Sequence, residues 1–207
     1  IPGLKILSAR EIDAIHAASL AILRDTGVMV HHGETLKRLE ESGAKIDRAN
    51  RIARIPEQLV LDRIAQAGNK YVLSGRDAKQ TVRFGYSDLV LMSSPGQYSW
   101  IDGQSPHRRP ATIQDARDAI RLGEALDNIQ IVGAMAQPAE ISEKYRDVFL
   151  TAELVKGATK PTRCWIRNGR SARYVLEIYR TIAGGEAALR KRPMAEAFLE
   201  PISPLQY

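Results

Sequence analysis

The sequence predicts an α/β fold: an incomplete TIM (β/α)8 barrel preceded by N-terminal helices and a small antiparallel β-sheet. Three observations lead to it. The residues before 71 have helical periodicity, and residues 71–109 form short apolar runs separated by turn residues. After Pro110, strand-like and helix-like segments alternate, as in parallel strands joined by helical crossovers. We therefore expect three regions, at residues 1–70, 71–110 and 111–207.

The N-terminal region carries clear helix boundary signals. Ser8 and Glu11 have the spacing of a capping box that opens a helix, and Gly27 is placed to end it. A second helix is expected to end at Gly43, and a third to begin at Pro56. The apolar positions of the first helix share one face: Ile12, Ile15, Ile22 and Leu23.

The second region predicts one small antiparallel sheet. Its four apolar runs are separated by Gly-, Asp-, Ser- and Pro-containing turns. The expected strands are 71–74, 81–84, 89–92 and 98–101.

The third region predicts parallel strands that alternate with helices. Thr112 caps the first helix. The following elements are a strand at 129–135, a helix at 140–156, a strand at 163–166, a helix at 171–183 and a strand at 194–199. Three strands match the first three units of a barrel that needs about 250 residues to close. The free outer edge of the last strand favours self-association, so we expect a homo-oligomer.

Composition is that of a soluble globular protein, with 44% hydrophobic and 26% charged residues. No apolar run approaches the roughly 20 residues of a membrane span, so no membrane partner is expected. The chain starts without Met or a signal-peptide pattern, which favours a piece of a longer protein. The single cysteine, Cys164, excludes an internal disulfide and fits a cytoplasmic location. Its place within a strand favours a small buried apolar residue over a nucleophile.

The net charge of +6 comes from one segment, residues 163–192, which holds eight basic and two acidic residues. A solvated helix face is the simplest interpretation. The alternative function is a non-catalytic binding module that docks an acidic partner or RNA through this segment. No nucleic-acid motif accompanies it.

Nucleotide and metal motifs are absent from the sequence. There is no Gly-x-Gly-x-x-Gly after a strand and no P-loop, and the histidines lack zinc-site spacing, so no metal site is expected.

Candidate binding residues follow the strands, because barrel enzymes assemble their sites at the carboxyl ends. Aromatic faces with a nearby carboxylate would suit a quaternary ammonium ligand. For Asp102, which precedes a glycine, a hairpin turn is the stronger interpretation. The candidate substrate-binding residues are Gln97, Tyr98, Asp102, Gln137, Trp165, Glu200 and Ser203.

Several short runs, in order along almost the whole chain, resemble the trimethylamine methyltransferase (MttB-like) family. They are LSxxEIxxIHxxSLxIL at 7–23, TGV at 26–28, ARIP at 53–56, GRD at 75–77, RPAT at 109–112, ALDNI at 125–129, TKP at 159–161, AGGE at 183–186 and PISPL at 201–205. Members are about twice as long, so the resemblance covers an N-terminal fragment.

The resemblance implies a TIM-barrel methyltransferase that moves a methyl group from a methylated or quaternary amine, such as trimethylamine or glycine betaine. The acceptor is Co(I) of cobalamin carried by a partner corrinoid protein. In the trimethylamine enzymes a pyrrolysine activates the substrate. Its position would follow Tyr207, so no catalytic residue is assigned within this sequence. Arg163 and Trp165 stand where members carry small and His residues, which suggests an anionic substrate such as a betaine, or a different packing solution.

Overall fold

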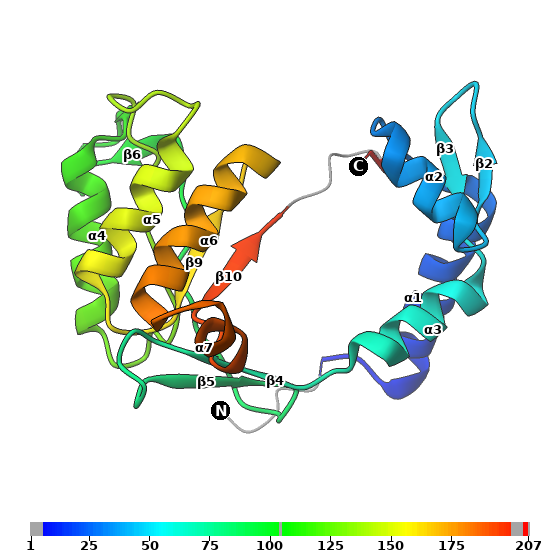
Figure 1. Ribbon diagram of the computed structural model, residues 1–207, viewed down its shortest axis with the longest axis horizontal. Helices are drawn as coiled ribbons and strands as arrows, with labels where there is room; N and C mark the ends of the chain where they lie inside the picture. Colours follow the sequence, from blue (N-terminus) through cyan, green and yellow to red (C-terminus); the bar gives the residue numbers. More distant parts are fainter. Residues whose placement is uncertain (1–5, 104, 200–204, 207) are drawn as a thin grey trace. The chain divides into compact units, whose positions relative to one another are not determined.

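The computed structural model describes residues 6–103, 105–199 and 205–206, which form two compact units (Figure 1). One unit comprises the described residues up to 69 with Leu205 and Gln206, and the other runs from 70 to 199. Their helices and several small sheets confirm the α/β class. A further boundary at residue 110 stays a prediction. Within the described ranges, no helix is long and apolar enough to cross a membrane.

The first unit is a three-stranded antiparallel sheet with three α-helices. Its elements are α1 (Ala9–Ala21), the π-helical turn η1 (Ile22–Thr26), β1 (Val28–Met29), α2 (Gly33–Glu41), β2 (Lys45–Asp47), β3 (Ile52–Arg54) and α3 (Glu57–Ala67). The sheet order is β1-β3-β2. Met29 also bridges Gln206 in parallel, so the described end of the chain belongs to this unit.

The predicted boundaries of these helices are confirmed, with one shift. Ser8 and Glu11 form the capping box, and Gly27 ends the helical run with a φ of 82°. A Cβ at position 27 would lie 2.6 Å from the carbonyl oxygen of Ala53, so only glycine fits there. Pro56 is the N-cap of α3, so the helix begins at Glu57, one residue later than expected.

Burial of the apolar face of α1 is not observed. Ile12, Ile15 and Ile22 are all exposed among the described residues. Helical periodicity predicts that these residues share a face but does not say whether anything covers it.

The second unit joins two hairpins to a parallel sheet. Its elements are β4 (Tyr71–Ser74), β5 (Thr81–Phe84), β6 (Ser99–Ile101), β7 (Arg108–Pro110), α4 (Ile113–Ala125), β8 (Val132–Gly133), α5 (Arg146–Gly157), β9 (Thr162–Trp165), α6 (Gly169–Ala183), α7 (Glu186–Lys191) and β10 (Ala195–Phe198). The sheet order is β10-β9-β8, and both pairings are parallel. The predicted parallel strand–helix–strand series is thus confirmed.

One predicted small antiparallel sheet is wrong: the structure has two separate hairpins, β4-β5 and β6-β7. Residues 89–92 are not an antiparallel strand. Met92 bridges Ile131, and Gln97 bridges Ala136, both in parallel, so residues 92–97 run along the free edge of β8. Four parallel segments therefore lie side by side: residues 92–97, β8, β9 and β10. Along the chain they are connected in turn through α4, α5 and α6.

Gly133 explains how residues 92–97 are accommodated. The carbonyl oxygen of Ser94 lies 2.1 Å from the place where a Cβ of residue 133 would stand. The hydroxyl of Ser93 accepts a hydrogen bond from Gly133 N at 2.7 Å and donates one to Gly133 O at 3.3 Å. The close approach of the backbone at Ser93 and Ser94 to Gly133 determines that residues 92–97 pair with the β8 region. The turn residues in the sequence do not indicate this approach.

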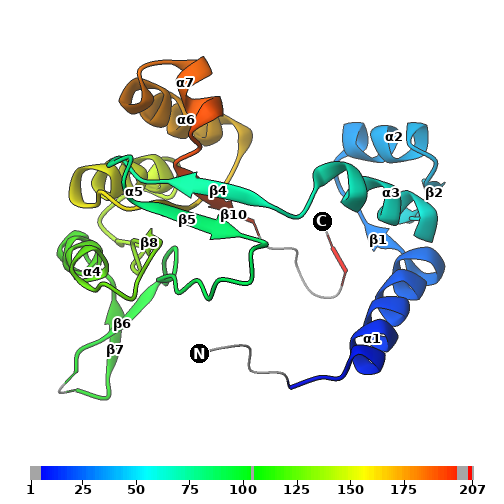
Figure 2. The ribbon, with the colours of Figure 1, turned by 90° about the horizontal axis from the view of Figure 1, so that it is seen from below.

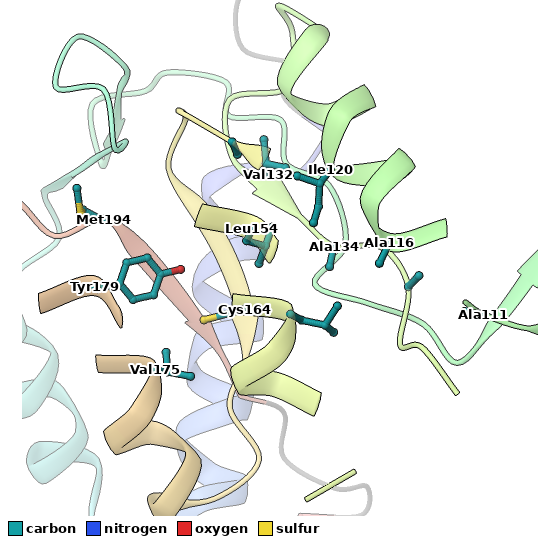
Figure 3. Packing of buried hydrophobic residues seen from close by; sticks show 13 residues of the cluster. Ala111, Ala116, Ile120, Val132, Ala134, Leu154, Cys164, Val175, Tyr179 and Met194 are labelled. Atoms are coloured by element: carbon teal, nitrogen blue, oxygen red, sulfur yellow. The ribbon is translucent and has the colours of Figure 1, made fainter. Parts of the chain in front are cut away.

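Helices α4, α5 and α6 pack against one face of the parallel sheet and form its main apolar core (Figure 3). From the sheet, the core receives Val132, Ala134 and Cys164, while Tyr179 of α6 lies beside Cys164. The hydroxyl groups of Tyr179 and Thr162 are 2.6 Å apart, which satisfies both polar groups within the core.

The hairpin β4-β5 covers the amino ends of these strands. Leu73 and Val82 pack on Ile131, directly before β8. Ser74 N donates to the carbonyl of Pro193, two residues before β10, and Figure 2 shows the hairpin beside that strand. The carboxyl ends lie at the opposite edge.

Other differences are local. The helix expected at 140–156 begins only at Arg146, because residues 138–145 make turns instead. The short α7 was not predicted. The strand expected at 129–135 is limited to Val132–Gly133, since its partners change along its length.

Candidate functional site

The carboxyl ends of the parallel segments carry the sequence-predicted residues Gln97, Gln137 and Trp165 at one edge of the sheet. Gln137 N donates to the carbonyl of Gln97 at 2.8 Å. Gln97 and Gln137 therefore lie side by side at the ends of two neighbouring parallel segments. Trp165 ends β9. Met135, between β8 and Gln137, has a φ of 54°, a strained backbone conformation that is common near functional sites.

Gln137 is buried, with 2% of its surface exposed. Its Nε2 lies 2.5 Å from where a Cβ of residue 96 would stand, so Gly96 makes room for the carboxamide. Its Oε1 has no hydrogen-bond partner among the described residues. A buried amide oxygen without a donor is costly, which marks the position as one that needs a further partner.

Tyr98 is half exposed and surrounded by arginines. Its hydroxyl accepts a hydrogen bond from Arg167 at 2.6 Å. The guanidinium groups of Arg167 and Arg146 lie 5.6 and 6.0 Å from its ring centroid. The face that would attract an ammonium ligand already faces two cations, so the substrate-binding role of Tyr98 stays a prediction with no added support.

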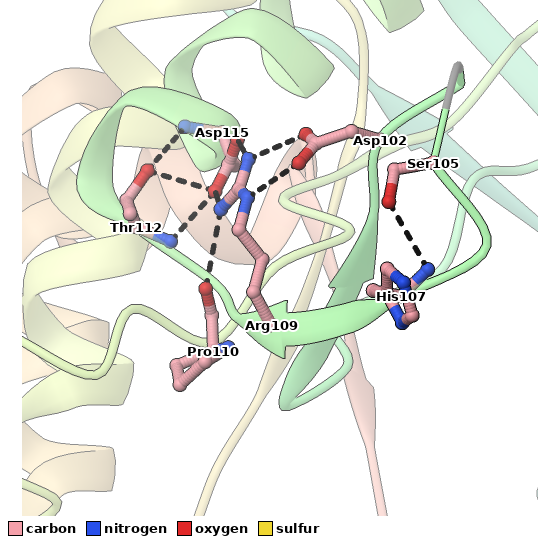
Figure 4. A network of polar contacts seen from close by, with 7 residues as sticks. All are labelled: Asp102, Ser105, His107, Arg109, Pro110, Thr112 and Asp115. Carbon is pink, nitrogen blue, oxygen red and sulfur yellow. Dashed lines mark hydrogen bonds and ion pairs between the residues drawn. The ribbon is translucent and has the colours of Figure 1, made fainter.

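Asp102 belongs to a structural network (Figure 4). Its two oxygens accept hydrogen bonds from Arg109 at 2.8 and 2.9 Å. Arg109 also donates to Asp115, which receives two further hydrogen bonds from Thr112 as part of the α4 capping box. Arg109 thereby lowers the pKa of both carboxyl groups. These contacts fit the hairpin interpretation of Asp102.

We expect Asp115→Asn to lower the free energy of unfolding by about 1–2 kcal/mol at pH 7, because it weakens the helix cap and leaves Arg109 without one anionic partner. The folded-state pKa lies below the ordinary value, so this stabilisation is present above roughly pH 4 and is lost as the pH falls. Urea unfolding at pH 7 and pH 3 measures it. The exposed Asp118→Asn is the control, and an equal effect at both pH values would contradict the assignment.

Trp165 has an aromatic partner that sequence reasoning missed. Phe198 lies opposite it in the β9-β10 register, and the two rings meet edge to face, 5.6 Å apart at 70°. The other tryptophan, Trp100, packs against the helical core from hairpin β6-β7. Parallel register would have pointed to Phe198, but register depends on contacts between distant segments.

Two predicted residues, Glu200 and Ser203, lie outside the described residues. Among the described ones, no group of three or more His, Cys, Asp or Glu side chains is placed to hold a metal ion.

Cys164 is buried, as predicted, and burial raises the pKa of its thiol to about 11. We expect native protein to react with a disulfide reagent at pH 8 more than about a hundredfold slower than urea-unfolded protein, because so little thiolate is present. Thiol titration in both states measures this. Rapid stoichiometric labelling of the native chain would contradict it.

Two of the eight basic side chains in segment 163–192 form ion pairs with its two carboxylates. Arg180 contacts Glu177 and Glu186, and Arg190 also contacts Glu186. Ion pairs within one segment reduce the field that it presents to an acidic partner. The other basic residues of the segment keep its positive excess, so docking of an acidic partner or RNA through it stays a prediction.

Polar and aromatic side chains at the carboxyl ends of parallel strands are the arrangement of α/β enzymes. The whole chain, residues 1–207, matches the family described as trimethylamine methyltransferase (MTTB). The chain belongs to this family, which confirms the resemblance.

The relatives of this chain include several that are named trimethylamine methyltransferase MttB. The one from Desulfitobacterium hafniense (strain DSM 10664 / DCB-2) is 30% identical over 204 residues, or 99% of this chain and 41% of the relative. The one from Methanosarcina barkeri (strain Fusaro / DSM 804) is 26% identical over 98% of this chain and 42% of the relative. A glycine betaine methyltransferase of Desulfitobacterium hafniense (strain Y51) is 23% identical over 100% and 43%. The chain thus spans about two-fifths of these relatives.

Proposed function

We propose that the full-length protein transfers a methyl group from a small methylated or quaternary amine to Co(I) of a corrinoid carried by a partner protein. Family membership over the entire chain is the observation that supports it most strongly. Relatives named for trimethylamine and for glycine betaine both support a methylated amine as methyl donor.

In this proposal the four parallel segments are the first part of a (β/α)8 barrel, and the amine binds at their carboxyl ends. The series of parallel strands joined by helices and the core between sheet and helices support that architecture. The methyl carbon leaves nitrogen and bonds to cobalt, while the amine keeps the electron pair. The corrinoid is therefore a substrate, and the residues of this chain hold and orient the amine.

Trp165 supplies the aromatic surface for the ammonium group. It ends β9, and Phe198 supports it edge to face. Because an ammonium is attracted to an aromatic face, we expect Trp165→Leu in the full-length protein to weaken amine binding at least about tenfold. Trp165→Phe should retain most of the affinity.

Isothermal titration with glycine betaine and trimethylamine measures the effect. Trp100→Phe is the matched control, because Trp100 packs against the helical core and should leave binding unchanged. Equal affinities for Trp165→Leu and wild type would remove Trp165 from the site.

A further inference from the structure

The inner face of the parallel sheet, opposite the helices, carries an ion pair between Arg163 and Glu196. Thr162 and Cys164 face the helical side, as their contacts with Tyr179 and the apolar core show. Because side chains alternate along a strand, Arg163 lies on the opposite face. Parallel register brings Glu196 of β10 beside it.

Both charged groups have unused hydrogen-bonding capacity. Arg163 Nη2 and Glu196 Oε1 are 3.4 Å apart, and the side chains are 17% and 27% exposed. The guanidinium donates one hydrogen bond, at 3.0 Å, to the weak acceptor Sδ of Met92. Arg163 Nε and Glu196 Oε2 are buried without a hydrogen-bond partner among the described residues. A desolvated pair of this kind is stabilising only when its remaining groups are satisfied.

Aromatic rings lie directly beside the pair. The guanidinium of Arg163 stands 4.5 Å from the centroid of Phe198, which meets Trp165 edge to face. Trp165 is two residues further along β9, on the same face and roughly 6.6 Å closer to the carboxyl end. A cationic donor group, a carboxylate and an aromatic corner thus follow one another along the inner face.

We propose that Arg163 and Glu196 select a zwitterionic methyl donor, a quaternary ammonium that carries a carboxylate, over a purely cationic amine. This rests on the proposed function and names the substrate class of the same site. An arginine repels a cation but binds a carboxylate through two parallel hydrogen bonds. Glu196 offsets the charge of Arg163, so the pair forms a dipole that a zwitterion complements.

The order of the groups also orients the ligand. The carboxylate binds deeper, at Arg163, and the quaternary ammonium lies at Trp165. Its methyl groups then point to the carboxyl ends of the strands, where a methyl acceptor would approach.

Isothermal titration of the full-length protein with glycine betaine and choline tests this inference, because choline keeps the trimethylammonium group and lacks the carboxylate. We expect glycine betaine to bind at least about tenfold tighter than choline. Arg163→Gln should remove that preference by weakening betaine binding alone, and Arg163→Lys should retain part of it. Arg173→Gln, on the exposed surface of α6, is the matched control.

Equal affinity of the wild type for both ligands, or an equal loss for both in folded Arg163→Gln protein, would overturn the inference. If Arg163→Gln fails to fold, two measurements still test the inference: the preference of the wild type for glycine betaine over choline, and the same preference in Arg163→Lys. Methyl transfer from trimethylamine without betaine binding would leave the proposed function intact and overturn this inference. Arg163-dependent betaine binding without methyl transfer would support this inference and contradict the proposed function.

Discussion

Gly133→Val is expected to destabilise the second unit by at least about 3 kcal/mol, or to prevent its folding. A Cβ at residue 133 would stand 2.1 Å from the carbonyl oxygen of Ser94 and 2.8 Å from that of Ser93. Both atoms are backbone, so rotation of a side chain cannot relieve the clash. Residues 92–97 would have to separate from β8, breaking the hydrogen bonds that join them. Chemical denaturation followed by circular dichroism measures the loss.

The matched control is Gly169→Ala, at the start of α6. Nothing lies within 4 Å of the Cβ that this change adds, and alanine favours the helix, so stability should stay the same or rise slightly. If Gly133→Val and Gly169→Ala unfold at the same denaturant concentration as wild type, the pairing of residues 92–97 with β8 is wrong.

Lys160→Met is expected to lower the free energy of unfolding by about 3 kcal/mol, the second large effect. Lys160 is 9% exposed. Its Nζ donates hydrogen bonds to three carbonyl oxygens beyond and at the end of α4, those of Gly123, Leu126 and Ile129, at 2.8–3.1 Å. Methionine fills similar space but donates nothing, so three acceptors lose their charged partner.

Lys156→Met is the control for this change. Lys156 is exposed and pairs with Glu153 on the same helix, an interaction worth a few tenths of a kcal/mol. Thermal and urea unfolding of both variants compare them directly. A loss of stability below about 0.5 kcal/mol for Lys160→Met would contradict a stabilising role for the three hydrogen bonds of Lys160.

The sequence predicted best what depends on neighbouring residues. The capping box at Ser8, the helix cap at Thr112 and the helix end at Gly27 all rest on contacts within a few residues, and all are present. The burial of Cys164 followed from its place in an apolar strand. The parallel order of β8, β9 and β10 followed from strand–helix alternation.

Long-range pairing could not be predicted in the same way. Residues 89–92 have the composition of an antiparallel strand, but the missing side chain of Gly133 allows residues 92–97 to pair in parallel with the β8 region. For the same reason, the sequence did not point to Glu196 and Phe198, because only the β9-β10 register places them beside Arg163 and Trp165. Gln137 and Trp165 could be named as candidates because the ends of strands can be predicted from the sequence, and their binding role stays a prediction.

Anaerobic methyl transfer by the full-length protein tests the proposed function most directly. Cob(I)alamin, free or on its carrier protein, is mixed with glycine betaine, proline betaine, carnitine or trimethylamine, and its absorbance is followed. We predict protein-dependent formation of methylcobalamin with at least one methylated amine, and with a betaine first. A folded protein that methylates no cobalamin with any of the four amines would contradict the assignment as a methylated-amine methyltransferase.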